Sequence, residues 1–383
     1  MAPLSERRIA VTGGGTAGHI LPAVEFLQTY RREFGADGCF IGCAAGLESR
    51  LVPANGERLE MIPGRPWARQ GWMGRLRAVA CLPAAVLAAR RVLRREKIQL
   101  VVGCGGYASF STCVAAYTLG VPVVIHEANA EPGLANRIVG RIAALICVGF
   151  PQAASRVRGP VEVTGTPTGR VVRSAPRNAP PWRFLVLGGS EGSPPLNREA
   201  PRLFAELRRT GLAFSVWHIA GFGDAAAIAR EYAASGVVAQ VDGFIDDIAA
   251  VYAGATLAIA SAGARTLAEL SAAGIPSLLV PLPGAANDHQ TANARLYAAH
   301  TGAAQVLESS WDAAVLASRL ASLLADPREL HRLGERAAAW NNRGAALRVV
   351  RACERVLTGR QELKRLPAEA EPACSCGTKP RTS

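Results

Sequence analysis

Acidic residues are scarce in this sequence. Its 383 residues include 30 Asp and Glu against 43 Lys and Arg, which gives a formal net charge of +13. The motifs of nucleic-acid-binding modules are absent too: there is no zinc-finger spacing, no basic region with heptads and no RNA-binding signature of aromatic and basic residues. No nucleic-acid partner is therefore expected. Three explanations of the charge remain: an anionic membrane surface, phosphate-bearing substrates, or an arginine-rich composition without a function of its own.

A secretory signal and a membrane-spanning segment are also missing. One apolar stretch, residues 78–89, lies between Arg77 and Arg90. As a helix it would be about 18 Å long, well short of the roughly 30 Å of a bilayer core. We therefore expect no transmembrane segment.

Residues 65–97 nevertheless hold nine Arg and Lys and a single acid, Glu96. This pattern fits either an ordinary surface helix with extended arginines or a patch that lies on anionic lipid. The apolar residues of this candidate membrane patch are Trp72, Met73, Leu76, Val79, Leu82 and Val86.

The cysteines give no disulfide framework, because there are nine of them and they are scattered. Cys374 and Cys376 form a C-x-C motif with no His or second Cys pair nearby, and there is no D-x-D or cluster of His and carboxylates. No metal or cofactor held by protein ligands is therefore expected.

Short apolar segments alternate with helical ones along most of the chain. Strands are predicted at 8–13, 100–106, 121–127 and 144–150, and again at 183–193, 214–221, 237–244, 256–263 and 276–283. Strands and helices that alternate with short connections indicate parallel sheets covered by helices. The pattern restarts after a proline-rich break near residue 176, so we expect an α/β protein with two Rossmann-like domains. The expected boundaries are 1–175, 176–340, a helix at 341–359 that returns to the first domain, and a disordered tail at 360–383.

Each half opens with a strand, a glycine-rich turn and a helix, as VTGGGTAGH (11–19) and LGGSEG (187–192) show. Such junctions direct backbone N–H groups and the helix dipole at an anion. The first turn is not a P-loop, because no Gly-Lys-Ser/Thr follows. It is not a clean dinucleotide fingerprint either, because no acidic residue closes the next strand. Each turn alone also fits ordinary α/β packing, but two of them favour a cleft that binds one phosphorylated ligand from each side.

Several polar residues follow predicted strands at the edge where open α/β sheets bind ligands. His19 fits either a structural role near a helix start or a general base. Glu269 lies on the second turn of a helix whose start could hold a diphosphate, and it is placed to accept hydrogen bonds from two ribose hydroxyls. Glu127 and Asn129 face the same kind of edge, and Gln290 and Asn293 suit sugar hydroxyls.

The motifs GGGTAGH, GGY (105–107), HEANAEPGLANR (126–137), GGSEG, VDGFIDDIAAVYAGATLAIASAGARTLAE (241–269) and PLPGAANDHQTANA (281–294) occur in this order. As a set, the sequence from about residue 8 to 350 resembles the MurG family of peptidoglycan glycosyltransferases. The resemblance implies a GT-B fold and inverting transfer of N-acetylglucosamine (GlcNAc) from UDP-GlcNAc to the C4 hydroxyl of N-acetylmuramic acid (MurNAc) in undecaprenyl-pyrophosphoryl-MurNAc-pentapeptide (lipid I). It also implies a peripheral place on the cytoplasmic face of the bacterial inner membrane, with other cell-wall synthesis proteins as partners.

The resemblance also assigns residues to roles. His19 is the first choice for the catalytic base and Glu127 the second. Donor positions are Thr16, Ala17, Gly18, Asn129, Arg170, Ser190, Ile245, Ala264, Arg265, Thr266, Leu267, Ala268, Glu269 and Gln290. Acceptor positions are Gly14, Gly15, Gly105, Gly106, Tyr107 and Asn136.

The sequence departs from the family pattern at three of these positions. Ala17 stands where the first loop usually has a glycine, so its methyl group is expected to restrict the loop or crowd a ligand. Arg170 is one residue late for the usual donor contact. Arg265 replaces an apolar residue and is expected to add a cation for the leaving group.

Two other classes of function remain open at this stage. One is a different GT-B enzyme, such as a glycosyltransferase with another lipid or small-molecule acceptor, or a UDP-sugar epimerase. The other is a non-catalytic subunit that binds UDP-sugars.

Overall fold

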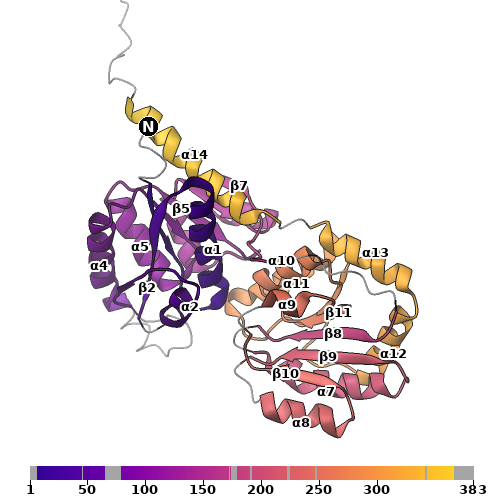
Figure 1. The fold of residues 1–383 in the computed structure, drawn as a ribbon. Helices are drawn as coiled ribbons and strands as arrows, with labels where there is room; N and C mark the ends of the chain where they lie inside the picture. The colour runs from indigo at the N-terminus through magenta and orange to yellow at the C-terminus, as the bar shows by residue number, and fades with distance from the viewer. Residues whose placement is uncertain are drawn as a thin grey trace, which may run out of the picture.

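Two parallel sheets, each covered by helices, make up the computed structural model (Figure 1). The structure describes residues 7–44, 46–64, 79–171, 173, 179–189, 192–221, 225–245, 248–340 and 343–365. Of the predicted membrane patch, Trp72, Met73 and Leu76 lie outside these residues, as do Ser190 and the Cys374/Cys376 tail.

The first sheet has the order β3-β2-β1-β4-β5-β6-β7, and all of its paired strands are parallel. Its strands are β1 (Arg8–Thr12), β2 (Asp37–Cys43), β3 (Leu59–Ile62), β4 (Leu100–Gly103), β5 (Val123–Glu127), β6 (Leu145–Val148) and β7 (Val161–Val163). Its helices are α1 (Ala17–Phe34), α2 (Glu48–Ala54), α4 (Leu82–Arg95), α5 (Gly106–Thr118), α6 (Leu134–Val139) and the 3₁₀ helix η2 (Pro151–Arg156).

The second sheet has the order β10-β9-β8-β11-β12-β13 and is also parallel. Its strands are β8 (Trp182–Leu187), β9 (Phe214–Ile219), β10 (Ala239–Asp242), β11 (Leu257–Ala260), β12 (Ser277–Leu279) and β13 (Ala304–Val306). Its helices are α7 (Pro194–Arg208), α8 (Ala225–Ala234), α9 (Ile248–Tyr252), α10 (Ala264–Ala273), η3 (Ala286–Asp288), α11 (His289–Thr301), α12 (Ala313–Leu324) and α13 (Pro327–Ala338).

All nine strands predicted from the sequence are present, because buried parallel strands form nearly continuous apolar runs. The sequence analysis missed β2, β3, β7 and β13. Of these, β3, β7 and β13 have only three or four residues and lie at or next to sheet edges, where burial is partial. Such segments carry little apolar pattern to detect.

The strand order reverses between β1 and β4 in the first sheet and between β8 and β11 in the second. Open parallel sheets bind ligands at such points, outside the carboxyl ends of the strands. The loops that follow β1, β4, β8 and β11 contain the glycine-rich turns and the start of α10. Topology therefore places the glycine-rich turns and the start of α10 at two ligand-binding edges.

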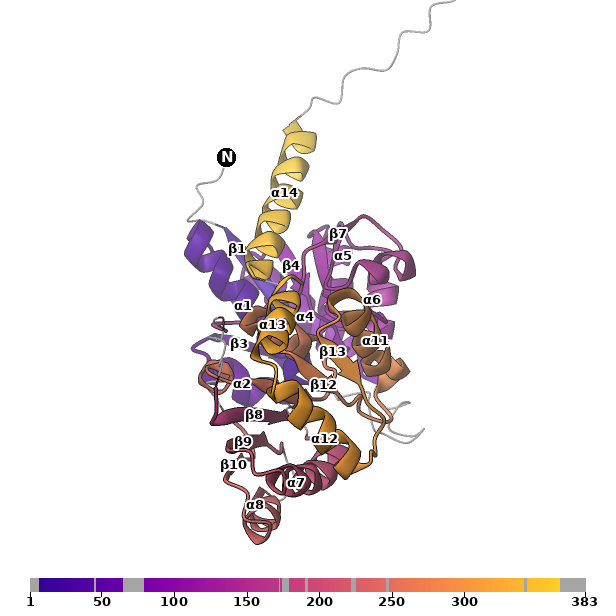
Figure 2. The ribbon, with the colours of Figure 1, turned by 90° about the vertical axis from the view of Figure 1, so that its right-hand side faces the viewer.

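The last described helix, α14 (Ala345–Arg365), packs against α1 of the first domain (Figures 1 and 2). Val349, Val350 and Cys353 of α14 belong to the same buried cluster as Ile20 and Leu27 of α1. The helix ends at Arg365, six residues after the expected end at residue 359.

Candidate active site

Two loops of the first domain are fixed against each other. The Gly14 N–H donates to the Gly105 carbonyl at 3.1 Å, and the Cys104 N–H donates to the Thr12 carbonyl at 2.7 Å. The backbones approach so closely that a Cβ at Gly106 would lie 2.5 Å from the Gly14 carbonyl oxygen. Glycine is therefore required here, as it is at Gly13, whose Cβ would lie 2.5 Å from the His19 carbonyl oxygen.

His19 lies in the first turn of α1, beside this pair of loops. Its Nδ1 is 3.0 Å from the Gly14 carbonyl oxygen, which can only accept a hydrogen bond. Nδ1 must therefore carry the proton, and Nε2 of the neutral ring has the free lone pair that a general base needs. A Cβ at Gly105 would lie 3.3 Å from Nε2, so the glycine there leaves this nitrogen uncovered.

Ala17 is the first residue of α1 and points into the protein core. Its side chain is 7% exposed and belongs to the buried cluster with Ile20 and Val24. Its φ is not positive, so the position does not require glycine. The methyl group therefore packs in the hydrophobic core of the first domain.

Glu127 ends β5 and holds the loop that follows it. Oε1 accepts hydrogen bonds from the Asn129 N–H at 2.8 Å and the Asn129 amide at 3.2 Å, and Oε2 accepts from the Gly133 N–H at 3.0 Å and the Asn136 amide at 2.9 Å. The carboxylate is 2% exposed. Four donors, three from the loop after β5 and one from α6, are the pattern of a structural anchor.

The carboxyl edges of the two sheets meet at Asn293, which is fully buried on α11. Its Oδ1 accepts the Ala130 N–H at 2.9 Å, and its amide donates to Asn129 Oδ1 and to the Ala262 carbonyl, both at 3.1 Å. Asn129 and Ala130 follow β5, and Ala262 follows β11. This single side chain therefore joins the ligand-binding edges of the two domains and has no amide group left for a sugar.

The start of α10 offers free backbone donors. Gly263 is the N-cap, and the Leu267 N–H is the first to bond within the helix, to the Gly263 carbonyl at 3.0 Å. The N–H groups of Ala264, Arg265 and Thr266 thus precede the helical ladder and suit an anion. The side chains of Leu267 and Ala268 are fully buried and serve packing.

Backbone N–H groups that follow β11 and β12 orient the side chain of Gln290 on α11. Its Oε1 accepts the Ala262 N–H at 3.1 Å and the Leu282 N–H at 2.9 Å. With the oxygen used by the backbone, the side-chain NH₂ is the group that can address a ligand.

Glu269 is 5% exposed and is bound on both oxygens. Arg265 Nε donates to Oε1 at 2.7 Å, and the Tyr252 hydroxyl donates to Oε2 at 2.9 Å. Two fixed donors give this carboxylate a defined orientation. The Nε of Arg265 is thereby bound to Glu269.

The structure also gives the positions of four other predicted residues. Thr16 is the N-cap of α1, and Ile245 packs against the core of the second domain. Tyr107 packs against the first-domain core, and Arg170 is exposed on the connection between the domains.

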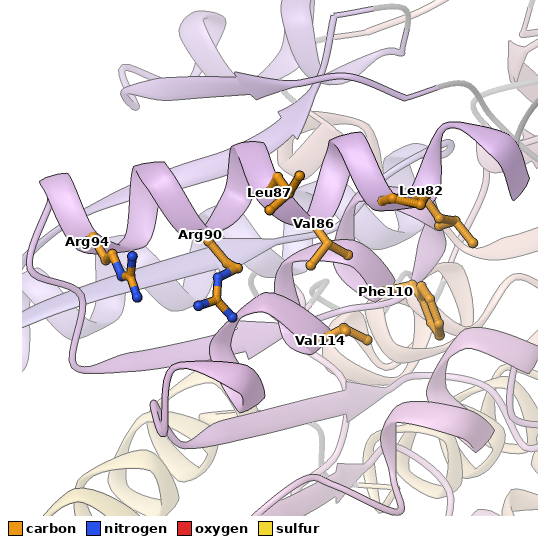
Figure 3. Close-up of a pocket in the computed structure, with 8 residues that line it drawn as sticks. Leu82, Val86, Leu87, Arg90, Arg94, Phe110 and Val114 are labelled. Atoms are coloured by element: carbon orange, nitrogen blue, oxygen red, sulfur yellow. The ribbon is translucent and has the colours of Figure 1, made fainter.

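An apolar groove lies between α4 and α5, and arginines border one side of it (Figure 3). Leu82, Val86 and Leu87 of α4 and Phe110 and Val114 of α5 line it, with Arg90 and Arg94 farther along α4. Leu87 is 54% exposed and Val79, at the start of this segment, is 45% exposed. We call these lining residues the α4–α5 groove.

Within the described ranges, no group of three or more His, Cys, Asp or Glu is arranged to hold a metal ion. In the same part of the chain, no helix is long and apolar enough to span a bilayer.

Sequence reasoning missed two residues of this region, Glu25 and Tyr252. Glu25 lies seven residues after Gly18 and so on the same face of α1, which is the signal that could have revealed it. Tyr252 is separated from Glu269 by a strand, and nothing in the local pattern connects them.

Comparisons with known proteins agree with this geometry. The model of the glycosyltransferase family 28 N-terminal domain matches residues 9–148, and that of the C-terminal domain matches residues 183–347. A UDP-N-acetylglucosamine–N-acetylmuramyl-(pentapeptide) pyrophosphoryl-undecaprenol N-acetylglucosamine transferase of Pseudomonas fluorescens is 40% identical, over 92% of this chain and 99% of its own length.

Among solved structures, MurG of Acinetobacter baumannii superposes with a TM-score of 0.73 at 28% identity, over 91% of this chain and 99% of that one. A UDP-N-acetylglucosamine 2-epimerase shares the fold with a TM-score of 0.68, but at 15% identity.

Two parallel α/β domains that meet at their ligand-binding edges define a nucleotide-sugar enzyme of the GT-B class. Because the identity with the epimerase is only 15%, its structural similarity shows a shared fold and nothing more. The chain belongs to glycosyltransferase family 28 and, within it, to the MurG family.

Proposed function

We propose that this protein transfers GlcNAc from UDP-GlcNAc to the C4 hydroxyl of MurNAc in undecaprenyl-pyrophosphoryl-MurNAc-pentapeptide, with inversion at the anomeric carbon. The observation that carries the proposal is the 40% identity to a transferase of that name over 92% of this chain. The geometry of the site supports a mechanism for it.

His19 is the base in this mechanism. The Gly14 carbonyl holds the Nδ1 proton, so Nε2 accepts the proton of the attacking hydroxyl. The four hydrogen bonds to Glu127 favour the anchoring role for that residue, because its oxygens already accept from the loop after β5 and from α6.

The second domain binds the donor. The free N–H groups at the start of α10 stabilise the negative charge that develops on the leaving diphosphate, and the helix dipole adds to this effect. Glu269 accepts hydrogen bonds from the ribose hydroxyls through its remaining lone pairs, and the Gln290 NH₂ donates to the sugar. These donors are in place before the reaction and need no reorganisation during it.

The α4–α5 groove docks on the anionic membrane surface that carries the acceptor. Exposed apolar side chains beside arginines are suited to the boundary between lipid head groups and acyl chains. We infer that the enzyme acts as a peripheral protein on the cytoplasmic face of the bacterial inner membrane.

One assay tests the function. Purified protein is incubated with UDP-GlcNAc labelled in the sugar and a short-chain analogue of the lipid acceptor, and the disaccharide lipid is measured. A parallel reaction without acceptor is analysed for epimerised UDP-sugar. Transfer to the analogue is expected, whereas epimerisation, or transfer only to a different acceptor, would contradict the proposal.

A further inference from the structure

Arg265 is an arginine at the boundary between the two domains. Its Nε donates to Glu269 Oε1 one helical turn away, at 2.7 Å. Its Nη1 lies 3.9 Å from Glu25 Oε2, which belongs to α1 of the first domain. The side chain is only 17% exposed. One guanidinium therefore faces a carboxylate from each domain.

Glu25 is held in place for this contact. Its Oε2 accepts the Gly169 N–H at 2.8 Å, from the connection that joins the domains. Burial raises the pKa of Glu25, while the charge of Arg265 opposes that shift. A Cβ at Gly169 would lie 3.2 Å from Arg265 Nη2, so the connection also packs against the guanidinium.

The contact between Glu25 and Arg265 is longer than a hydrogen bond. At 3.9 Å it is about 1 Å beyond an ordinary N–H···O distance. Nη1 is buried and forms no hydrogen bond within the described residues. A small approach of the two domains would satisfy this donor, and a separation would leave it without its acceptor. The energy of the contact thus depends on the relative position of the domains.

We propose that Glu25 and Arg265 are positioning residues that couple domain closure to the orientation of Glu269. Closure brings Glu25 to Arg265, and Arg265 in turn holds the Glu269 carboxylate against the Tyr252 hydroxyl. Glu269 then presents its remaining lone pairs to the donor ribose in one fixed orientation. The inference rests on the proposed role of Glu269 in ribose binding.

A double-mutant cycle tests the coupling, with UDP affinity measured by calorimetry. Glu25→Gln keeps an acceptor for the Gly169 N–H but removes the charge, and Arg265→Met removes the guanidinium. We expect each single variant to weaken UDP binding about five- to tenfold. The double variant should bind no more weakly than Arg265→Met, because the two changes disrupt one interaction. Independent effects that multiply would overturn the proposal.

Glu33→Gln is the matched control. Glu33 lies on the same helix, but its ion pair is with the adjacent Arg32 on the surface. We expect its UDP affinity to equal that of the unaltered protein. If Arg265→Met fails to fold, the UDP affinities of Glu25→Gln and Glu33→Gln still test the proposal. Equal affinities of these two variants would overturn it.

A second ligand separates ribose positioning from a direct contact to the diphosphate. 2′,3′-Dideoxy-UDP has no hydroxyls for Glu269, so Glu25→Gln should not change its affinity. An equal loss for UDP and the dideoxy analogue would contradict the positioning role. Glu269→Ala measured with both ligands tests the ribose assignment itself, and acceptor turnover tests the transferase function separately.

In steady state, Glu25→Gln should raise KM for UDP-GlcNAc about five- to tenfold and change kcat less than twofold. A general structural defect would instead lower the active fraction, and with it kcat, at an unchanged KM.

Discussion

At the scale of single residues, hydrogen-bond partners distinguish two side chains that the sequence leaves equivalent. His19 follows β1 and Glu127 ends β5, and both are chemically able to act as a base. At His19 both partners, the Gly14 carbonyl and the Thr16 hydroxyl, are on Nδ1, whereas four donors bind the two oxygens of Glu127. A group whose lone pairs are already used is a poor acceptor for a substrate proton.

His19→Ala should lower kcat by a factor of about 10² to 10⁴, the usual contribution of a general base. UDP affinity should change little, since the proposed sites for the donor diphosphate and ribose lie in the other domain. Turnover is measured in the acceptor assay and UDP binding by calorimetry. Near-normal turnover in this variant would remove His19 from the catalytic role.

Ala17→Gly should leave turnover within twofold of the unaltered enzyme, because the methyl group it removes is buried in the core. Stability should fall by about 1 kcal/mol, because glycine is less favourable than alanine in a helix. Chemical denaturation and the acceptor assay measure the two effects. A clear gain in turnover would show that the methyl group does restrict the loop.

At the scale of elements, the site depends on two strand–turn–helix units whose loops contact each other. Positive φ and close backbone approach impose glycine at some positions of these loops and not at others. The sequence shows a run of glycines, and only the structure shows which of them are required.

Gly106→Ala should destabilise the first domain by about 2 kcal/mol or more. Its φ is +87° and the new Cβ would lie 2.5 Å from the Gly14 carbonyl oxygen. Gly18→Ala is the matched control, since the nearest atom to its Cβ would be Thr16 Oγ1 at 3.6 Å. The control should not lose stability. Equal thermal unfolding temperatures for the two variants would contradict the requirement at Gly106.

β9 carries a buried histidine that links the stability of the second domain to pH. His218 Nδ1 is 3.0 Å from the Tyr232 hydroxyl and Nε2 is 3.1 Å from Asn197 Oδ1. Burial lowers the pKa of His218 to about 4, from an ordinary value near 6.5. Between pH 6.5 and pH 4, His218 binds a proton in the unfolded chain but not in the folded domain. The free energy of unfolding is therefore highest above pH 6.5 and falls as the pH decreases toward 4.

From pH 7.5 to pH 5, His218 should therefore cost the domain about 2 kcal/mol of unfolding free energy. His218→Gln lacks the titrating group and should lose correspondingly less over the same range. Urea unfolding of both proteins at the two pH values measures the difference. Parallel losses in the two proteins would show that His218 does not carry this pH dependence.

At the scale of the whole molecule, contacts distant in sequence join the two domains. Asn293 binds the edge of the first sheet, Arg265 faces Glu25, and α14 packs against α1. The α4–α5 groove lies on the first domain, and it is the surface that we propose docks on the membrane.

Arg94→Glu should weaken binding to vesicles that contain anionic lipid by about tenfold, since a cation near such a surface contributes roughly 1 kcal/mol. Arg91→Glu makes the same charge change on the same exposed helix, but Arg91 does not line the groove. A vesicle sedimentation assay should show a loss of less than threefold for this control. Equal losses would mean that net charge, rather than the groove, determines binding.

The sequence by itself determined the class of fold. Apolar runs in buried parallel strands, glycine-rich turns and amphipathic helices are local patterns, and they indicated both domains and most of their strands. The same patterns placed His19, Glu269 and Gln290 in segments that follow strands, at the edge where α/β proteins bind ligands. The short strands β3, β7 and β13 were missed because their stability comes from the neighbouring strand rather than from their own composition.

The tertiary structure alone decided how these residues can act. Whether a carboxylate anchors a loop or is free for a substrate depends on its hydrogen-bond partners, and those of Glu269 include Tyr252, which lies 17 positions away. Whether a methyl group at Ala17 crowds a ligand depends on the side of the backbone on which it lies. The pairing of Arg265 with Glu25 joins residues 240 positions apart, and no local pattern encodes it, because only the approach of the two domains brings the charges together.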